Sequence, residues 1–282
     1  MLVLSRTTCY SAGRAVVLKT LSRFKSTAAP PGCWLPICGV DIRRIPMSNS
    51  EKCRVASFLA KNFFPHDPIM KAAGLKKPDP AILQYYLTLM NENMSLYAQV
   101  PDSREILGVA INSRNSLTTT FELKSLASRL ATDEARRYMS MMSQLEERGN
   151  VFKTYQIDKA FAVEVLAVGE RYRRRGIGQM LLEESVRQAK NMKYPMVKAS
   201  TGSSYAQRAA LTCELYKKHF SRPALSFRDD RGLPWVKHEL CPPHQSVDIL
   251  IADVRPKAKA ADKKDIECDT YGLEKYDKKW GK

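Results

Sequence analysis

Several features that mark common protein classes are missing from this 282-residue chain. No apolar run approaches the ~20 residues of a membrane-spanning helix, so no membrane partner is predicted. The seven cysteines are odd in number and contain no Cys-x-x-Cys pair, which fits a reducing compartment best. The chain has neither the Gly-Lys-Ser or Gly-Lys-Thr of a P-loop nor the Gly-x-Gly-x-x-Gly of a dinucleotide-binding turn. Nucleotide binding through either of these loops is therefore excluded.

Histidine is also scarce, with four residues in the whole chain. His238, Cys241 and His244 come nearest to a set of metal ligands. Two prolines stand between the last two of them, and the sequence offers no fourth ligand nearby. No metal is therefore predicted. His244 is expected in a substrate pocket or at the cap of a turn.

Acidic residues are absent from residues 1–40, where five basic residues alternate with apolar and hydroxyl side chains. This composition is typical of an amphipathic mitochondrial presequence over residues 1–30, which predicts a protein of the mitochondrial matrix. The alternative is a basic tail that carries no targeting signal, on a cytoplasmic protein. Residues 255–282 hold nine basic and six acidic residues and are predicted to be mostly disordered. The folded domain is expected over residues 40–254.

The formal net charge is +17, and residues 41–254 hold 32 basic against 23 acidic residues. A moderately basic domain suits an anionic ligand and also suits a nucleic-acid surface. No RNA- or DNA-binding motif accompanies the charge. An anionic ligand is therefore favoured, and nucleic acid is not a predicted partner.

The most informative stretch runs from Phe161 to Gln188. Its first part, Phe161–Val168, is apolar except for Glu164, which predicts a buried strand. A strongly basic loop follows, and after it apolar residues recur at the spacing of one helix face, with charged residues left for solvent. Those apolar residues are Ile177, Leu181, Leu182, Val186 and Ala189. Strand, loop and helix together predict a βα unit.

The loop Arg173-Arg174-Arg175-Gly176-Ile177-Gly178 carries the chemistry of this unit. Its glycines let a ligand approach the backbone closely, and the helix that follows directs unpaired N–H groups and a positive dipole toward the same point. Such a site suits a pyrophosphate. The alternative interpretation is a tight turn flanked by solvated arginines.

The spacing Arg173-x-x-Gly176-x-Gly178 after Leu166-Ala167-Val168 resembles the acetyl-CoA signature of the GNAT superfamily of N-acetyltransferases. The resemblance implies an α/β fold, with a mixed, largely antiparallel sheet that splays between its fourth and fifth strands and is flanked by helices. It implies acetyl-CoA as co-substrate, with its pyrophosphate on the loop backbone and its pantetheine amides on the strand edge. The implied cofactor-binding residues are Leu166, Ala167, Val168, Arg173, Arg174, Arg175, Gly176, Ile177 and Gly178.

Periodicity and turn signals predict the elements around this unit. Helices are expected over residues 51–64, with Ser50 as the N-cap, and over 79–91, 132–147 and 205–219. Strands are expected over residues 41–45, 96–100, 105–112, 194–200, 225–228, 235–240 and 247–254.

Three further segments resemble one branch of the superfamily, the insect-type arylalkylamine N-acetyltransferases. They are Phe63-Phe64-Pro65-His66-Asp67-Pro68, the turn Thr201–Ser204, and Pro242-Pro243-His244. The resemblance implies that the substrate-binding residues are Phe63, Phe64, Ser203, Ser204 and His244. The chain departs from the family pattern at Asp67, where a glutamate is usual, and at Ala206, where a serine is usual.

Amine acetylation requires a base for the ammonium proton and an acid for the leaving thiolate. Asp67, in a turn fixed by two prolines, and Glu164, on the same strand face as Leu166 and Val168, are both candidate bases. The resemblance adds Tyr216 as the candidate acid. The alternatives are a solvated acid at a helix end for Asp67, a strand-edge ion pair for Glu164 and a packing aromatic for Tyr216.

These observations predict an acetyl-CoA-dependent N-acetyltransferase that acts on the primary amine of a small (aryl)alkylamine. One alternative is a protein or peptide lysine N-acetyltransferase, which would need an acidic groove. The other is a non-catalytic scaffold that binds acetyl-CoA. The sequence predicts neither the acceptor amine nor the oligomeric state.

Overall fold

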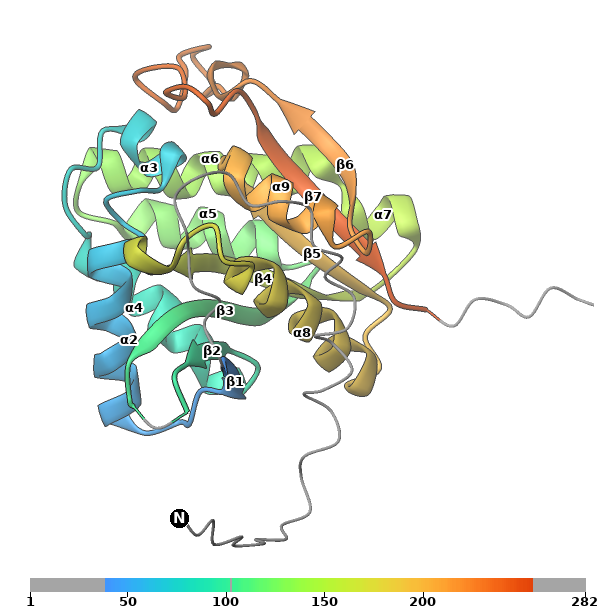
Figure 1. Cartoon of the computed structure of the whole chain (residues 1–282). Coiled ribbons are helices and arrows are strands. Elements are labelled where there is room, and N and C mark those ends of the chain that lie inside the picture. The colour runs from blue at the N-terminus through green and yellow to red at the C-terminus, as the bar shows by residue number, and fades with distance from the viewer. Residues whose placement is uncertain (1–38, 102, 256–282) are drawn as a thin grey trace, which may run out of the picture. The chain divides into compact units, whose positions relative to one another are not determined.

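The computed structural model describes residues 39–101 and 103–255 (Figure 1). The predicted presequence and residues 256–282 of the predicted tail lie outside this range. The described residues form a seven-stranded sheet of order β1-β2-β3-β4-β5-β7-β6, in which β4 and β5 are parallel and all other neighbours antiparallel. The strands are β1 (Asp41–Arg44), β2 (Leu96–Gln99), β3 (Ile106–Ser116), β4 (Lys159–Val168), β5 (Met196–Thr201), β6 (Lys217–Arg222) and β7 (Val247–Asp253).

Helices cover both faces of the sheet, as the predicted fold class requires. In Figure 1, α8 and α9 cross in front of the sheet and α5 and α6 lie behind it. The main hydrophobic core lies on the α6 side, where Val109, Ile111 and Val165 pack with apolar residues of α2, α4 and α6. The helices are α2 (Asn49–Asn62), α3 (Pro68–Ala73), α4 (Pro80–Leu89), α5 (Thr119–Arg129), α6 (Asp133–Gly149), α7 (Val151–Tyr155), α8 (Ile177–Asn191) and α9 (Ser204–Thr212).

Side chains fix where several of these helices begin. Asp67 and Asp79 each precede a proline at the first helical position and accept hydrogen bonds from backbone N–H groups of the first turn. Ser48 Oγ caps α2 by accepting from the N–H of Glu51 at 3.2 Å. The predicted cap, Ser50, is wrong because it already lies inside the helix.

β4 separates from β5 after three paired residues. Phe161, Ala162 and Val163 pair with β5, and within the described chain the rest of β4 pairs with β3 alone. A β-bulge interrupts the β3–β4 ladder, so that Ile111 pairs with Val165 but Asn112 pairs with Val163. Glu164 is therefore the extra residue of the bulge, which bends the strand. The predicted splay between the fourth and fifth strands is confirmed.

Three predictions for the C-terminal part are wrong. The helix expected over residues 205–219 ends at Thr212, and His219 lies in β6 instead. The reason is tertiary, because β6 pairs with β7 and His219 Nε2 lies 2.7 Å from the carbonyl oxygen of Gly149. The strands expected over residues 225–228 and 235–240 form the 3-10 turn η4 (Ala224–Ser226) and a loop. Pro223 and Pro234, which stand just before these segments, cannot donate to a ladder, and the described residues there form a single isolated bridge.

The position of the core predicts that two leucine-to-alanine substitutions will change the free energy of unfolding by very different amounts. Leu59 of α2 is 0% exposed, whereas Leu233 in the loop after β6 is 59% exposed. We expect Leu59→Ala to lower the free energy of unfolding by about 2–5 kcal/mol, because it leaves a cavity. Leu233→Ala should change it by no more than about 0.5 kcal/mol. Urea denaturation followed by circular dichroism measures both, and equal losses would contradict the assigned core.

Candidate active site

The separation of β4 from β5 creates a free strand edge in the middle of the sheet. Leu166, Ala167 and Val168 pair with β3 on one side, and no described strand pairs with them on the other. Backbone N–H and C=O groups on an unpaired edge are hydrogen-bonding partners for an extended ligand. The structure therefore brings three predicted cofactor-binding residues to an edge that can accept an amide-containing chain.

The loop after β4 ends at the N-terminus of α8. Gly176 has φ +79°, a conformation that favours glycine, and a Cβ there would meet no atom within 4 Å. Among the described residues, no side chain caps this helix. A Cβ at Gly178 would lie 3.7 Å from the side chains of Leu166 and Val168, so the first turn of α8 lies against the end of β4. Uncapped N–H groups facing open space fit a pyrophosphate.

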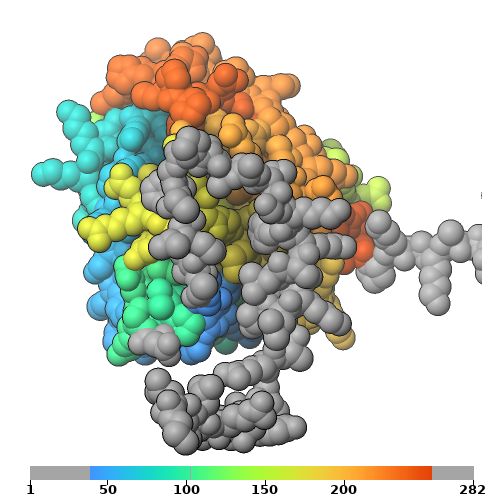
Figure 2. Space-filling view, viewed as in Figure 1, coloured from blue at the N-terminus to red at the C-terminus, as the bar shows by residue number. Residues whose placement is uncertain are grey.

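The arginines of the loop have different partners. Arg173 Nε donates to the carbonyl oxygen of Val168 at 3.3 Å, which holds the loop to the end of β4. Arg175 lies over the ring of Tyr172, with 5.7 Å from guanidinium to ring centroid. Arg174 has φ +62° and is exposed. In Figure 2 this loop, coloured yellow, reaches the surface beside the blue and cyan N-terminal helices.

Asp67 lies where α3 begins, and its Oδ1 accepts from the N–H of Met70 at 2.8 Å. Burial raises the pKa of this carboxyl group to about 6, although hydrogen bonds from the backbone of Met70 and Ile69 oppose the shift. Phe63 stacks edge-on against Tyr86, with ring centroids 5.9 Å apart. The predicted acid and the predicted aromatic residue therefore lie in one half-buried region.

Glu164 is half-buried at the bulge of β4, and its Oε1 accepts from Ser113 Oγ at 2.8 Å. Burial raises the pKa of its carboxyl group, and the positive charge of Lys198 opposes that shift. The prediction that Glu164 shares a face with Leu166 and Val168 is wrong. The bulge turns Glu164 to the α6 side, whereas Leu166 and Val168 lie against α8.

A pair of buried tyrosines connects the two candidate bases. The hydroxyls of Tyr86 and Tyr138 are hydrogen-bonded at 2.8 Å. Burial raises the pKa of both phenols, and the negative charges of Asp67 and Glu164 raise it further. Both carboxylates therefore lie within electrostatic reach of the same pair, although they belong to different elements and are 97 positions apart in the sequence. For these tyrosines, the only signal in the sequence was an apolar helix face.

Tyr216 lies between α9 and β6, and its ring is 5% exposed. Its hydroxyl donates to the carbonyl oxygen of Leu182 in α8 at 3.4 Å, and burial raises the pKa of the phenol. The structure thus places it on the α8 side of the sheet. Its predicted role as the thiolate-protonating acid stays a prediction.

The turn after β5 and the loop before β7 meet. Ser204 N–H donates to His244 Nδ1 at 3.1 Å, and Ser204 Oγ donates to the carbonyl oxygen of Pro243 at 2.9 Å. Ser203 caps α9 by accepting from the N–H of Ala206. Burial, followed by the charge of Lys71, lowers the pKa of His244. The structure therefore brings three of the predicted substrate-binding residues together.

α3 connects this cluster to the pyrophosphate loop. A Cβ at Gly202 would lie 2.6 Å from Ile69 Cγ1, so the turn after β5 packs directly on α3. At the start of α3, burial lowers the pKa of His66 and the charge of Arg173 lowers it further. Phe64, by contrast, is 3% exposed and belongs to the core.

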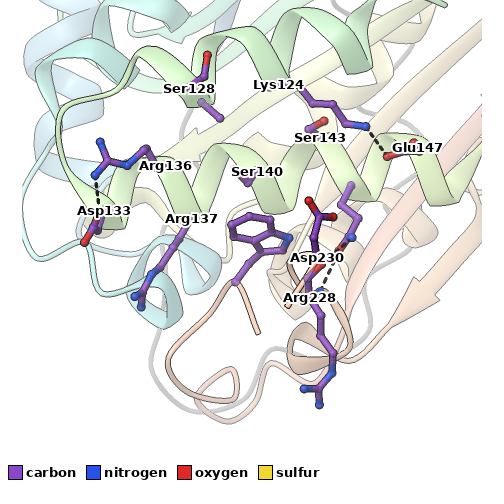
Figure 3. A pocket seen from close by; sticks show the side chains of 13 residues that line it. Lys124, Ser128, Asp133, Arg136, Arg137, Ser140, Ser143, Glu147, Arg228 and Asp230 are labelled. Atoms are coloured by element: carbon purple, nitrogen blue, oxygen red, sulfur yellow. Dashed lines mark hydrogen bonds and ion pairs between the residues drawn. The ribbon is translucent and has the colours of Figure 1, made fainter. Parts of the chain in front are cut away.

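Two hollows on the described surface contain neither the strand edge nor the loop. The one in Figure 3, of about 600 Å³, lies over the outer face of α5 and α6, where Lys124 pairs with Glu147 and Arg136 with Asp133. In the described part of the chain, no three His, Cys, Asp or Glu side chains are grouped to hold a metal. No described helix is long and apolar enough to cross a membrane.

Comparison with known proteins finds a match to one family model over part of the chain. Residues 141–220, which include β4, the loop and α8, match the model of the acetyltransferase (GNAT) family. The predicted resemblance to the GNAT superfamily is confirmed. No curated protein matches the chain.

Several solved structures share the fold of this chain at low sequence identity. A mosquito arylalkylamine N-acetyltransferase-like protein matches 76% of this chain and 100% of its own, with 18% identity and a TM-score of 0.70. Arylalkylamine N-acetyltransferase 2 of Aedes aegypti matches 76% and 99%, with 21% identity and a TM-score of 0.67. A Drosophila melanogaster polyamine N-acetyltransferase that forms N-acetylagmatine matches 76% and 100%, with 17% identity and a TM-score of 0.69. Family match and fold together support an acyltransferase enzyme.

The raised pKa of Asp67 predicts how stability depends on pH. The carboxyl group titrates near 3.8 in the unfolded chain and near 6 in the folded protein, so the folded state binds this proton more tightly. Stability should therefore fall as pH rises from about 4 to about 6, by about 1–3 kcal/mol. We expect Asp67→Asn to remove this fall, because asparagine keeps the helix cap without the charge.

Urea denaturation at a series of pH values measures this difference between the two proteins. Asp230→Asn, which removes an exposed loop carboxylate, is the control. A wild-type protein whose stability rises through the same window, relative to Asp67→Asn, would contradict the assignment.

Proposed function

We propose that this protein is an acetyl-CoA-dependent N-acetyltransferase whose acceptor is the primary amine of a small alkylamine, with arylalkylamines as the favoured class. The observation that carries the proposal is that three features occur together at one opening, the space between β4 and β5 after the two strands separate. A free strand edge, an uncapped helix N-terminus and a half-buried carboxylate at a bulge all belong to the short segment from Glu164 to Gly178.

The chain would bind the co-substrate mainly through its backbone. Acetyl-CoA would supply the acetyl group as a thioester. The N–H groups at the start of α8 would receive the pyrophosphate, and the edge at Leu166–Val168 would pair with the amides of the pantetheine arm. The shape of Gly176 supports this, because its φ of +79° opens the backbone toward space that no side chain fills.

One of the two half-buried carboxylates would accept the proton that the amine loses. The neutral nitrogen attacks the thioester carbonyl carbon, the carbon–sulfur bond breaks, and the thiolate takes a proton while the nitrogen loses one. Asp67 and Glu164 both have a raised pKa, so each is a better proton acceptor than an ordinary carboxylate. Both remain candidates for the base, and Tyr216 for the acid.

The surroundings of Asp67 support an apolar or aromatic acceptor. Phe63 and Tyr86 present stacked rings next to the start of α3, and His244 lies across the turn that packs on the same helix. The solved structures of similar fold include an arylalkylamine N-acetyltransferase and an enzyme that forms N-acetylagmatine. We favour the arylalkylamine because of these rings.

The first test is release of CoA by the purified protein from acetyl-CoA with tyramine, dopamine, serotonin, polyamines or a lysine peptide. Turnover with an aromatic amine is expected. Tight binding of acetyl-CoA without turnover on any acceptor would overturn the enzymatic proposal and favour a scaffold.

Removal of the base predicts a loss of turnover without a loss of cofactor binding. We expect either Glu164→Gln or Asp67→Asn to lower kcat by about 100-fold or more, whichever residue is the base. Calorimetry should show unchanged acetyl-CoA affinity in both variants. Glu134→Gln, at an exposed ion pair with Lys237, is the control. Full activity in both site variants would exclude these carboxylates as bases.

The backbone at the start of α8, here called the pyrophosphate cradle, can be tested with a matched pair of glycine variants. Gly176 and Gly232 have φ of +79° and +78°, and a Cβ meets nothing within 4 Å at either. The backbone strain of a valine should therefore be similar at both positions. We expect Gly176→Val to weaken acetyl-CoA binding by about tenfold or more, since a side chain would enter the cradle. Gly232→Val should leave the affinity unchanged, and equal effects would contradict the site.

A further inference from the structure

A buried ion pair joins α6 to β5 next to the candidate site. Lys198 Nζ pairs with the carboxylate of Glu146, and the two side chains are only 2% and 8% exposed. Ser200 Oγ donates to the other oxygen of Glu146 at 3.0 Å. Lys198 lies opposite Ala162, one pair before β4 and β5 part. The pair therefore lies at the closed end of the opening.

Glu164 lies beside this ion pair. The bulge directs its side chain to the α6 side of the sheet, the side from which Glu146 approaches Lys198. The positive charge of Lys198 and the negative charge of Glu146 both act on the carboxyl group of Glu164. Two carboxylates and one ammonium group thus share a small volume, with Ser113 and Ser200 as hydroxyl donors.

Stability alone does not account for a lysine at this position. Its neighbours along β5, Met196 and Val197, are both 0% exposed and apolar. A buried ion pair is expensive to desolvate, and apolar residues of similar volume often serve as well or better. The charged group is therefore better explained by what it does at the end of the site.

The side chain of Lys198 is itself an alkylammonium group. Beyond its Cβ it has the chemistry of the distal end of a diamine, and Glu146, which Ser200 holds by a hydrogen bond, supplies the carboxylate that such an end would require, with the charge of Glu164 acting nearby. We propose that Lys198 fills an acidic subsite with its own ammonium group and so restricts the acceptor to amines with one cationic group. This inference rests on the proposed function and gives it a narrower substrate class.

The proposal explains why one fold can serve different amines. An acidic subsite without the lysine would bind the second cation of a diamine, whereas in the occupied subsite the charge of Glu146 is already paired with Lys198. The ammonium group of Lys198 is attached to the chain, so a free diamine cannot displace it by competition.

Wild-type selectivity is the first test. With acetyl-CoA in excess, kcat/KM for tyramine should exceed that for putrescine by about tenfold or more, because the second ammonium group of putrescine finds no free carboxylate. Equal values for the two amines would overturn the proposal while confirming the proposed function.

The second test opens the subsite. Lys198→Ala should raise kcat/KM for putrescine relative to tyramine by about tenfold or more, because the distal ammonium can then pair with Glu146. The double variant Glu146→Gln with Lys198→Ala has the same space without the acid, and the ratio should return toward that of the wild type. Lys237→Ala, at an exposed ion pair with Glu134, is the control. A ratio that Lys198→Ala leaves unchanged would overturn the proposal.

A binding measurement separates failure of this inference from failure of the proposed function. Putrescine should raise the Tm of Lys198→Ala, and it should not raise the Tm of the wild type or of the double variant. This result is expected even if no acceptor is turned over. A Tm of Lys198→Ala that putrescine does not change would overturn the subsite, whatever the enzyme activity.

If Lys198→Ala does not fold, Lys198→Met with Glu146→Gln replaces the pair by uncharged groups of similar volume. This variant has neither an acid nor a cavity, so putrescine should remain a poor acceptor. A kcat/KM for putrescine that rises to the value for tyramine in this variant would contradict the proposal.

Discussion

The separation of β4 from β5 is the constraint on which the rest of this structure depends. Parallel neighbours require a crossover, and α8 supplies it, so the N-terminus of that helix necessarily lies at the end of β4. The bulge at Glu164 bends β4 after its three paired residues. Free backbone groups and free helix N–H groups therefore face the same opening, and the family match includes this segment.

The polar groups around the opening are at least partly buried, and hydrogen bonds or an ion pair hold each of them in place. Asp67 caps a short helix, Glu164 accepts from Ser113, and Lys198 pairs with Glu146. Each of these contacts satisfies a group that would otherwise be costly to remove from water. The same burial raises the pKa of both candidate bases, which costs stability when they are charged and makes them better proton acceptors.

The comparisons with solved structures and the residues of the site answer different questions. The solved structures share the fold at 17–21% identity, which establishes architecture and leaves the acceptor amine to the residues of this chain. Those residues are the aromatic rings near Asp67, the hydroxyls of the turn after β5 and the buried lysine of β5. The proposed acceptor, an aromatic monoamine, fits all of them: its apolar part would lie against the rings, its one charge would meet a carboxylate, and Lys198 would leave no place for a second charge.

The sequence by itself determined the parts that are local. The apolar run ending at Val168, the loop with Gly176 and the periodic helix after it predicted a βα unit, because strand, turn and helix signals depend on near neighbours. The spacing of Arg173, Gly176 and Gly178 carried the resemblance to the GNAT superfamily. Tertiary structure decided the rest. A bulge, which has no sequence signature here, turned Glu164 to the opposite face from Leu166. Pairing with β7 made a strand of His219, which periodicity assigned to a helix. The partner of Lys198 is Glu146, 52 residues away, and only the packing of α6 on the sheet brings the two charges together.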